Sequence, residues 1–268
     1  MNGSSGAVEA MSKYFDMLAY LMGKQAGGGG GGAGWTNDGI ATATEPNGNI
    51  VLGPNVTEIK ANAFAGKPIT RISGANVTKI GAFAFADCQE LTQITKDDFP
   101  NVTQISGDAA YAFIRGCSKL QLIHFPKLTT IPTGQWPSGT GAIGSSTIKP
   151  ILVLPKVTKF PNFRSYTTRF AAIDLGPDIT TTEISGTEYF YEGYVDILII
   201  RKSDAIVAAG NSNAIRRISS TTKIFVPQAL VSSYETASNW SAKGSIFYAI
   251  EGSQYEHYYA DGTPIPTT

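Results

Sequence analysis

A hydrolytic site of the triad type needs a histidine, and the chain has two, His124 and His257. A catalytic triad places a histidine beside a nucleophile and an orienting carboxylate. His124 stands between Ile123 and Phe125 in a strand-like run, so we expect its side chain to point outward to solvent. No G-x-S-x-G elbow is present to supply a nucleophile. We therefore predict no catalytic residue and no enzymatic activity.

Carboxylates and thiols are the other groups that could do chemistry. The acids could form a catalytic pair or a Ca²⁺ site, but no D-x-D-x-D-G loop gathers them, which favours solvated surface positions. The two cysteines have no third cysteine beside them, so we expect buried free thiols and neither a metal site nor a cofactor. The residues considered are Asp97, Asp98, Glu183, Glu188, Glu192, Asp196, Cys88 and Cys117.

Aromatic side chains form the strongest candidate binding group. A Gly/Ser-rich insertion at 134–149 carries a tryptophan, and residues 187–194 read TEYFYEGY. Tyr and Trp give large contact areas at low entropic cost and pack well on glycans or proteins. The alternative is that these rings fill the core where the repeats degenerate. The predicted binding residues are Trp136, Tyr166, Tyr189, Tyr191 and Tyr194.

The overall charge argues against nucleic acid as a partner. Lys+Arg and Asp+Glu are both 21 in 268 residues, and no run of basic residues is long enough to bind along a phosphate backbone. Charged residues make up 16%, against about 25% in typical domains, as expected of a neutral extracellular or virion-type surface. We expect a soluble protein without a membrane span or a signal peptide, because neither a long apolar segment nor a basic n-region is present.

An internal repeat sets the architecture. NVTKIGAFAFADCQELTQITKDDFP is followed by NVTQISGDAAYAFIRGCSKLQLIHFP, and related phrases begin at Pro54, Pro126, Pro155 and Pro177. Such periods predict a solenoid in which each unit buries its apolar face on its neighbours. The Val-x-x-Ile and Leu-x-x-Ile pairs should point inward from short strands, and the Ala-Phe pairs should lie in a helical turn. The sequons at Asn55, Asn76 and Asn101 come from the repeat itself and are predicted to be structural.

The ends of the chain have a different character. Residues 1–26 have apolar side chains at helical spacing, which predicts an amphipathic helix that docks on a partner, forms oligomers or folds back as an end cap. Residues 27–34 are a glycine-rich tether. Residues 35–53 should form a capping hairpin around Asn47-Gly48. The residues predicted for docking or oligomerisation are Met11, Phe15, Leu18 and Met22.

After the repeats of 54–202, residues 203–252 predict a C-terminal capping unit. It should hold a short helix in SDAIVAAG, a strand in IFVP, a helix after Pro227 and a strand in SIFYAIEG. Leu230, Tyr234 and Trp240 lie on the expected inward face of that second helix. The tail, 253–268, should be ordered only where it docks.

These units resemble the BspA-like class of leucine-rich repeats, close to V-x-x-I-G-x-x-A-F-x-x-C-x-x-L-x-x-I-x-x-P. The match is firm over 50–132 and loose over 133–202. It implies a right-handed solenoid used for adhesion or binding. The N-terminal segment and the C-terminal block look like those of phage and prophage proteins of Firmicutes, an analogy of fold and context.

We thus predict an α/β, β-rich fold: a right-handed leucine-rich-repeat solenoid with short parallel strands, an N-terminal amphipathic helix and a C-terminal capping unit. The predicted function is that of a phage or prophage tail-associated receptor-binding protein, located in the virion. The alternative is a bacterial cell-surface adhesin. Expected partners are a bacterial surface protein or glycan, other virion proteins through residues 1–26, and further copies of the chain.

Overall fold

The computed structural model describes residues 41–257 with internal gaps. The gaps are 45–47, 107–112, 130–147, 160–168, 181–182, 185–193, 211, 213–214 and 216–217. The predicted helix of 1–26, the tether of 27–34 and the tail beyond 257 lie outside the described residues.

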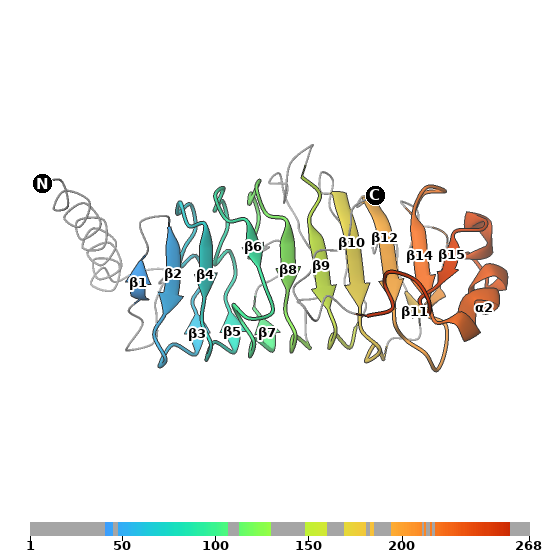
Figure 1. The fold of residues 1–268 in the computed structure, drawn as a ribbon, viewed down its shortest axis with the longest axis horizontal. Helices are drawn as coiled ribbons and strands as arrows, with labels where there is room; N and C mark the ends of the chain where they lie inside the picture. The colour runs from blue at the N-terminus through green and yellow to red at the C-terminus, as the bar shows by residue number, and fades with distance from the viewer. Residues whose placement is uncertain are drawn as a thin grey trace, which may run out of the picture.

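Parallel strands placed side by side along the long axis build the molecule (Figure 1). The main sheet has seven strands in the order β15-β14-β12-β10-β9-β8-β6, and every pairing in it is parallel. These strands are β6 (Gln93–Ile94), β8 (Leu122–His124), β9 (Ile151–Leu154), β10 (Arg169–Leu175), β12 (Tyr194–Ile200), β14 (Lys223–Val226) and β15 (Phe247–Ala249). The predicted solenoid of short parallel strands is therefore confirmed.

Smaller sheets complete the described coils. A three-stranded parallel sheet has the order β3-β5-β7, and β11 pairs with β13 in parallel. At the N-terminal end β1 is antiparallel to β2, and β2 is parallel to β4. These strands are β1 (Ala41–Thr44), β2 (Asn49–Leu52), β3 (Glu58–Ile59), β4 (Arg71–Ser73), β5 (Lys79–Ile80), β7 (Gln104–Ile105), β11 (Glu183–Ile184) and β13 (Ala208–Ala209). The β1–β2 pairing is the strand arrangement expected of a hairpin, and Gly48 between them has φ +77°.

The main core is made from the repeated apolar positions. The Val-x-x-Ile and Leu-x-x-Ile residues of the first repeats are buried, as predicted. Phenylalanine rings form a column along the stack, with neighbouring ring centroids 5.8–6.3 Å apart. The column contains Phe64, Phe85, Phe99, Phe113 and Phe125. Phe99 and Phe125, which stand just before the repeat prolines, were not singled out by the sequence pattern.

The Ala-Phe segments form turns and not the helical turn that we expected. Asn62, Phe83 and Asp87 have positive φ angles of 53–60°, which a right-handed helix excludes. Their main chain bonds instead to the next coil: the Phe64 N–H donates to the Ala84 carbonyl at 2.8 Å. The turns therefore stack by hydrogen bonds between coils.

A threonine ladder joins the coils on another side of the stack. In each coil the threonine N–H donates to the carbonyl of the preceding threonine at 2.8–3.3 Å. The hydroxyl donates to the same oxygen at 3.0–3.4 Å. The ladder runs through Thr57, Thr78, Thr103, Thr129, Thr158 and Thr180. It continues beyond the coils in which the Ala-Phe and Cys positions recur.

The C-terminal end is only partly as predicted. The strand in IFVP is β14, the strand in SIFYAIEG is β15, and the helix after Pro227 is the 3-10 turn η1 (Gln228–Leu230) continued by α2 (Val231–Thr236). Tyr234 and Trp240 are fully buried, as expected of an inward face, and another 3-10 turn, η2 (Ser241–Lys243), follows. SDAIVAAG does not form the expected helix, because its last alanines are strand β13, paired with β11.

Candidate recognition surface

One of the predicted binding residues, Tyr194, lies in the described part of the chain. Trp136, Tyr166, Tyr189 and Tyr191 lie outside the described residues, as do the N-terminal docking residues Met11, Phe15, Leu18 and Met22.

Tyr194 begins β12 and lies on the face of the main sheet that points away from the main core, here called the outer face. It is paired in register with Arg169, the first residue of β10. The Arg169 guanidinium carbon is 4.9 Å from the centroid of the Tyr194 ring, a cation–π contact worth about 0.5–1 kcal/mol at an exposed site. The tyrosine is 36% exposed, so its ring is held in place and still accessible.

Charged side chains also lie on and beside the strand that carries this ring. Asp196, two residues along β12, forms an ion pair with Lys149. Both side chains are substantially exposed, so the pair contributes little stability and its groups can be reached by a ligand. An aromatic ring beside carboxylate, ammonium and guanidinium groups can stack on a sugar or a peptide and bond to its hydroxyls or amides.

A second exposed tyrosine lies on the outer face farther along the sheet. Tyr248 of β15 is 43% exposed and is stacked on Phe225 of β14, with ring centroids 5.5 Å apart. Sequence reasoning placed Tyr248 in a strand without singling it out. The alternating pattern of IFYAI could have identified Tyr248 as an exposed ring, because Phe247 is buried and Tyr248 is on the opposite side of the strand. We call Arg169, Tyr194, Asp196 and Lys149 the outer-face patch; Tyr248 is a separate exposed ring, two strands away from β12.

A buried ion pair lies beneath the end of β12. Arg201 donates from Nε to Asp174 Oδ1 and from Nη2 to Asp174 Oδ2, both at 2.8 Å. Burial raises the pKa of the Asp174 carboxyl, and the hydrogen bonds and charge of Arg201 oppose that rise. Sequence reasoning missed this pair, because its members are 27 residues apart and meet only when β10 and β12 stack.

His124 does not point to solvent, contrary to the prediction. It is only 4% exposed, and its strand β8 is paired with β9, where His124 lies opposite Val153. Burial lowers the pKa of the imidazole to about 4, and the charge of Lys96 acts in the same direction. The outer face is covered at this position, so the usual alternation of buried and exposed strand residues fails.

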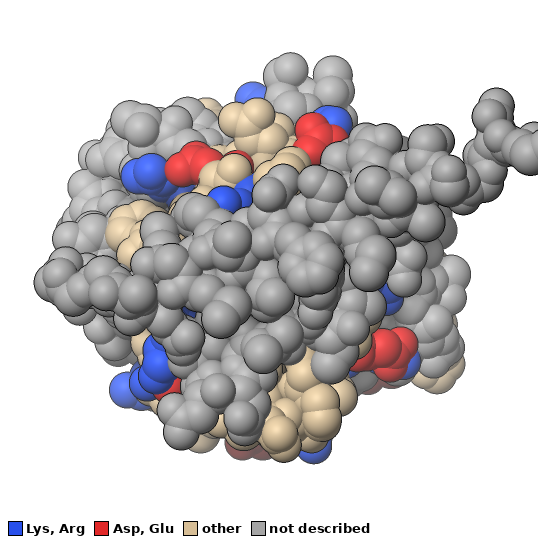
Figure 2. All heavy atoms as spheres, turned by 90° about the vertical axis from the view of Figure 1, so that its left-hand side faces the viewer, with Lys and Arg blue, Asp and Glu red and all other residues tan. Residues whose placement is uncertain are grey.

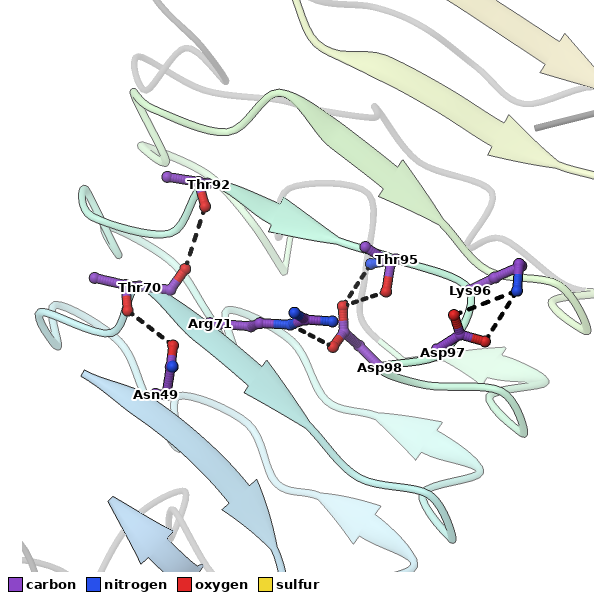
Figure 3. Close-up of polar contacts among 8 residues, drawn as sticks. All are labelled: Asn49, Thr70, Arg71, Thr92, Thr95, Lys96, Asp97 and Asp98. Atoms are coloured by element: carbon purple, nitrogen blue, oxygen red, sulfur yellow. Dashed lines mark hydrogen bonds and ion pairs between the residues drawn. The ribbon is translucent and has the colours of Figure 1, made fainter. Parts of the chain in front are cut away.

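Asp98 is also not a solvated acid, although Asp97 beside it is exposed. Figure 3 shows the Asp98 carboxylate between two coils. It accepts hydrogen bonds from Thr95 N–H and Thr95 Oγ1, both at 2.7 Å, and from Arg71 Nε at 2.9 Å. The prediction of a solvated position was therefore wrong for Asp98, and its carboxylate serves to join β4 to the coil of β6.

The cysteines and the sequon asparagines have the structural positions that were predicted. Cys88 and Cys117 are buried free thiols. Asn76 Nδ2 donates to the Pro54 carbonyl at 2.6 Å, and Asn101 Nδ2 donates to the Ala75 carbonyl at 2.8 Å. Each asparagine thus bonds to the preceding coil.

In the described ranges, the side chains that could bind a metal lie apart from one another. There, no group of three or more His, Cys, Asp or Glu residues could hold a metal ion. No helix among the residues with a described placement is long and apolar enough to cross a bilayer. Where described residues are visible in the view onto the N-terminal end of the stack, acidic and basic side chains lie next to one another near the edge (Figure 2).

Comparison with known proteins supports the type of repeat. The family described as BspA type leucine rich repeat region matches residues 44–138, in six copies. The curated proteins contain no match to the chain. Among solved structures, the chain is similar to the pneumococcal vaccine antigen PcpA, with 14% identity and a TM-score of 0.40 over 81% of this chain. The chain spans 44% of the length of that PcpA chain.

Proposed function

We propose that the protein is a non-catalytic recognition module that acts at a bacterial surface. The observation that carries the proposal is the combination of BspA-type repeats over residues 44–138 with exposed aromatic and charged side chains on the outer face. A rigid stack held by hydrogen bonds between its coils presents this surface without a large ordering cost on binding.

The more specific form of the proposal is a phage or prophage tail-associated protein that binds a receptor on the host cell. Residues 1–26, with Met11, Phe15, Leu18 and Met22 on one helical face, would attach the stack to other virion proteins or to further copies of the chain. The glycine-rich segment 27–34 would let the stack turn toward the host surface. The resemblance of both chain ends to phage proteins supports this form.

The receptor would be a surface glycan or protein that contacts the outer-face patch. Tyr194 offers a ring face beside the Arg169 guanidinium, and Asp196 with Lys149 supplies an acceptor and a donor next to it. Trp136, Tyr166, Tyr189 and Tyr191 are proposed to extend the binding surface.

A cell-binding experiment tests the proposal. Fluorescently labelled wild-type chain and variants are titrated onto cells of the host, and the melting temperature of each variant is measured. Tyr194→Ala, Trp136→Ala and Tyr191→Ala should each weaken binding without lowering the melting temperature. Val51→Ala is the matched control, because Val51 is 45% exposed at the opposite end of the stack. If the three aromatic variants bind as well as the wild-type chain and the control, the proposal is wrong.

A cell-surface adhesin is the second candidate, favoured by the BspA type of the repeats. Antibody detection in purified phage particles and in isolated cell walls separates the two locations. Light scattering of the chain with and without residues 1–26 tests the role of the N-terminal segment. A chain that is found in cell walls but not in particles, and whose number of associated copies does not change on removing residues 1–26, supports the adhesin.

A further inference from the structure

The chain's own turn at residues 252–257 covers a site on the outer face that is formed by Arg201, Asp174 and Phe225 and is here called the pocket. We propose that this pocket is an exchange site, which takes the same turn from a neighbouring copy of the chain and so links copies together. The inference is independent of the receptor-binding proposal, because it concerns Arg201 and Tyr255 and not the outer-face patch. Figure 1 shows the segment after β15 running back across β14 and β12.

The polar half of the pocket is the Arg201 guanidinium. Asp174 fixes it through the two hydrogen bonds of 2.8 Å, and both side chains are almost completely buried. The guanidinium also donates to three successive main-chain carbonyls of the turn: Nη2 to Tyr255 O at 2.9 Å, Nη1 to Glu256 O at 3.2 Å, and Nη2 to His257 O at 3.4 Å. A planar guanidinium held by a carboxylate is suited to such a set of acceptors.

The apolar half of the pocket takes the Tyr255 ring. This ring meets Phe225 edge to face, with centroids 4.4 Å apart, and is only 3% exposed. The residues around it form an apolar cluster on the outer face that is separate from the main core. The cluster contains Ile151, Val153, Ala171, Ala172, Ile199, Phe225, Ile250 and Tyr255. One buried aromatic ring with a charged clamp beside it is the usual composition of a binding hot spot.

The turn is built as a separate unit. Glu256 N–H donates to Ser253 O at 3.2 Å, and Tyr255 N–H donates to Ser253 Oγ at 3.1 Å, both within the turn. Ser253 also donates to the carbonyl of the nearby Ile250, from N–H at 3.1 Å and from Oγ at 2.6 Å. Within the described residues, the hydrogen bonds that tie 252–257 to the stack beyond the adjoining Ile250 all come from Arg201. The turn begins at Gly252, whose φ is +76°. The residue before it, Glu251, accepts a hydrogen bond from the Gln228 N–H through its side-chain carboxylate. Beyond this link at Ile250 and Gly252, the turn therefore meets the stack as a bound peptide would, through Arg201 and Phe225.

A second copy of the chain is the partner that matches this site, since it carries the same turn with the same tyrosine. Exchange of an identical element keeps the contacts with Arg201 and Phe225, and it needs the hinge to open and the Ser253–Ile250 hydrogen bonds to break. The attached turn competes at a high effective concentration, so the closed form dominates in dilute solution. Copies of the chain that are crowded on one surface would be linked to one another by exchanged turns.

A complementation experiment with the full chain tests the exchange. Tyr255→Ala keeps the pocket and loses the anchor, whereas Arg201→Lys keeps the turn and loses the planar clamp. One variant is labelled with a donor fluorophore and the other with an acceptor. The mixed pair should associate about tenfold more tightly than either variant with itself, since only the mixture combines an open pocket with an intact turn. Association through residues 1–26 would raise all three signals equally.

Two outcomes overturn the inference. One is equal association of the mixed and the unmixed pairs, with both variants folded by circular dichroism. If a variant does not fold, hydrogen exchange of the wild-type chain decides. A synthetic peptide of residues 250–257 in excess should speed exchange of amides 253–257 in the chain, and the same peptide with Tyr255→Ala should not. Unchanged exchange at saturating peptide would show that the turn is a fixed part of the fold.

Discussion

The thiol of Cys117 donates a hydrogen bond of 3.1 Å to the carbonyl oxygen of Phe85, which belongs to the preceding coil. Cys88 makes the same bond, also 3.1 Å long, to the Phe64 carbonyl. The repeat therefore places each cysteine where a small buried donor completes the stacking of two turns. Burial raises the pKa of the Cys88 thiol to about 12 and raises the pKa of Cys117 as well.

We predict that neither cysteine reacts with a thiol reagent in the folded protein at pH 8. The thiolate is the reactive form, and a thiol with a pKa near 12 has about one part in ten thousand ionised at that pH. Absorbance of a disulfide-exchange reagent counts reactive thiols before and after unfolding in guanidinium. The expected result is no reaction in the folded state and two equivalents after unfolding. One equivalent released rapidly from the folded protein would contradict it.

Stability should depend on pH through His124. Its pKa in the folded state is about 4, below the ordinary value of 6.5, so the unfolded chain takes up the proton first as the pH falls. The contribution of the neutral imidazole is complete above pH 6.5, falls between 6.5 and 4, and is flat below 4. The shift corresponds to about 3 kcal/mol over that window. Urea unfolding at several pH values measures it, and His124→Leu should remove this part of the slope. Parallel profiles for both proteins would refute the assignment.

Replacing Asp98 should be costly, whereas replacing Asp97 should not. Asp98→Ala leaves the Thr95 N–H and hydroxyl without their acceptor and removes the partner of Arg71, so we expect a loss of about 2–4 kcal/mol in the free energy of unfolding. Asp97→Ala is the control, since this side chain is 76% exposed, and it should change stability by less than about 0.5 kcal/mol. Equal effects in denaturant unfolding would mean that the Asp98 network adds nothing.

A methyl group at Gly176 should destabilise the stack more than one at Gly66. A Cβ at Gly176 would lie 1.7 Å from the Pro155 carbonyl oxygen, and both groups are main chain of adjacent coils that cannot turn aside. We expect a loss of about 3 kcal/mol or more for Gly176→Ala. Gly66 has φ +71° and open space around it, so Gly66→Ala should cost only about 1–2 kcal/mol of backbone strain. Thermal unfolding ranks the two, and the reverse order would contradict this account.

The predictable part of this fold is the part that repeats. Val77 and Ile80 were assigned to the core from their spacing alone, and both are fully buried. His124 was misplaced because the alternation rule assumes that one face of a strand meets water, whereas the outer face is covered at β8. Arg201 and Asp174 could not be paired from the sequence, since their contact depends on which strands become neighbours. Tyr194 is the predicted binding residue that the structure describes; it is exposed beside Arg169, and its role in binding stays a prediction.

The threonine ladder also has a mechanical consequence. Its hydrogen bonds connect one coil to the next, so they run along the long axis while the strands lie across it (Figure 1). A pulling force applied at the two ends of the stack would load these bonds in series. The weakest interface between coils would open first, and the molecule should lengthen in steps of one coil. An attachment that bears tension along this axis would therefore yield gradually before it breaks.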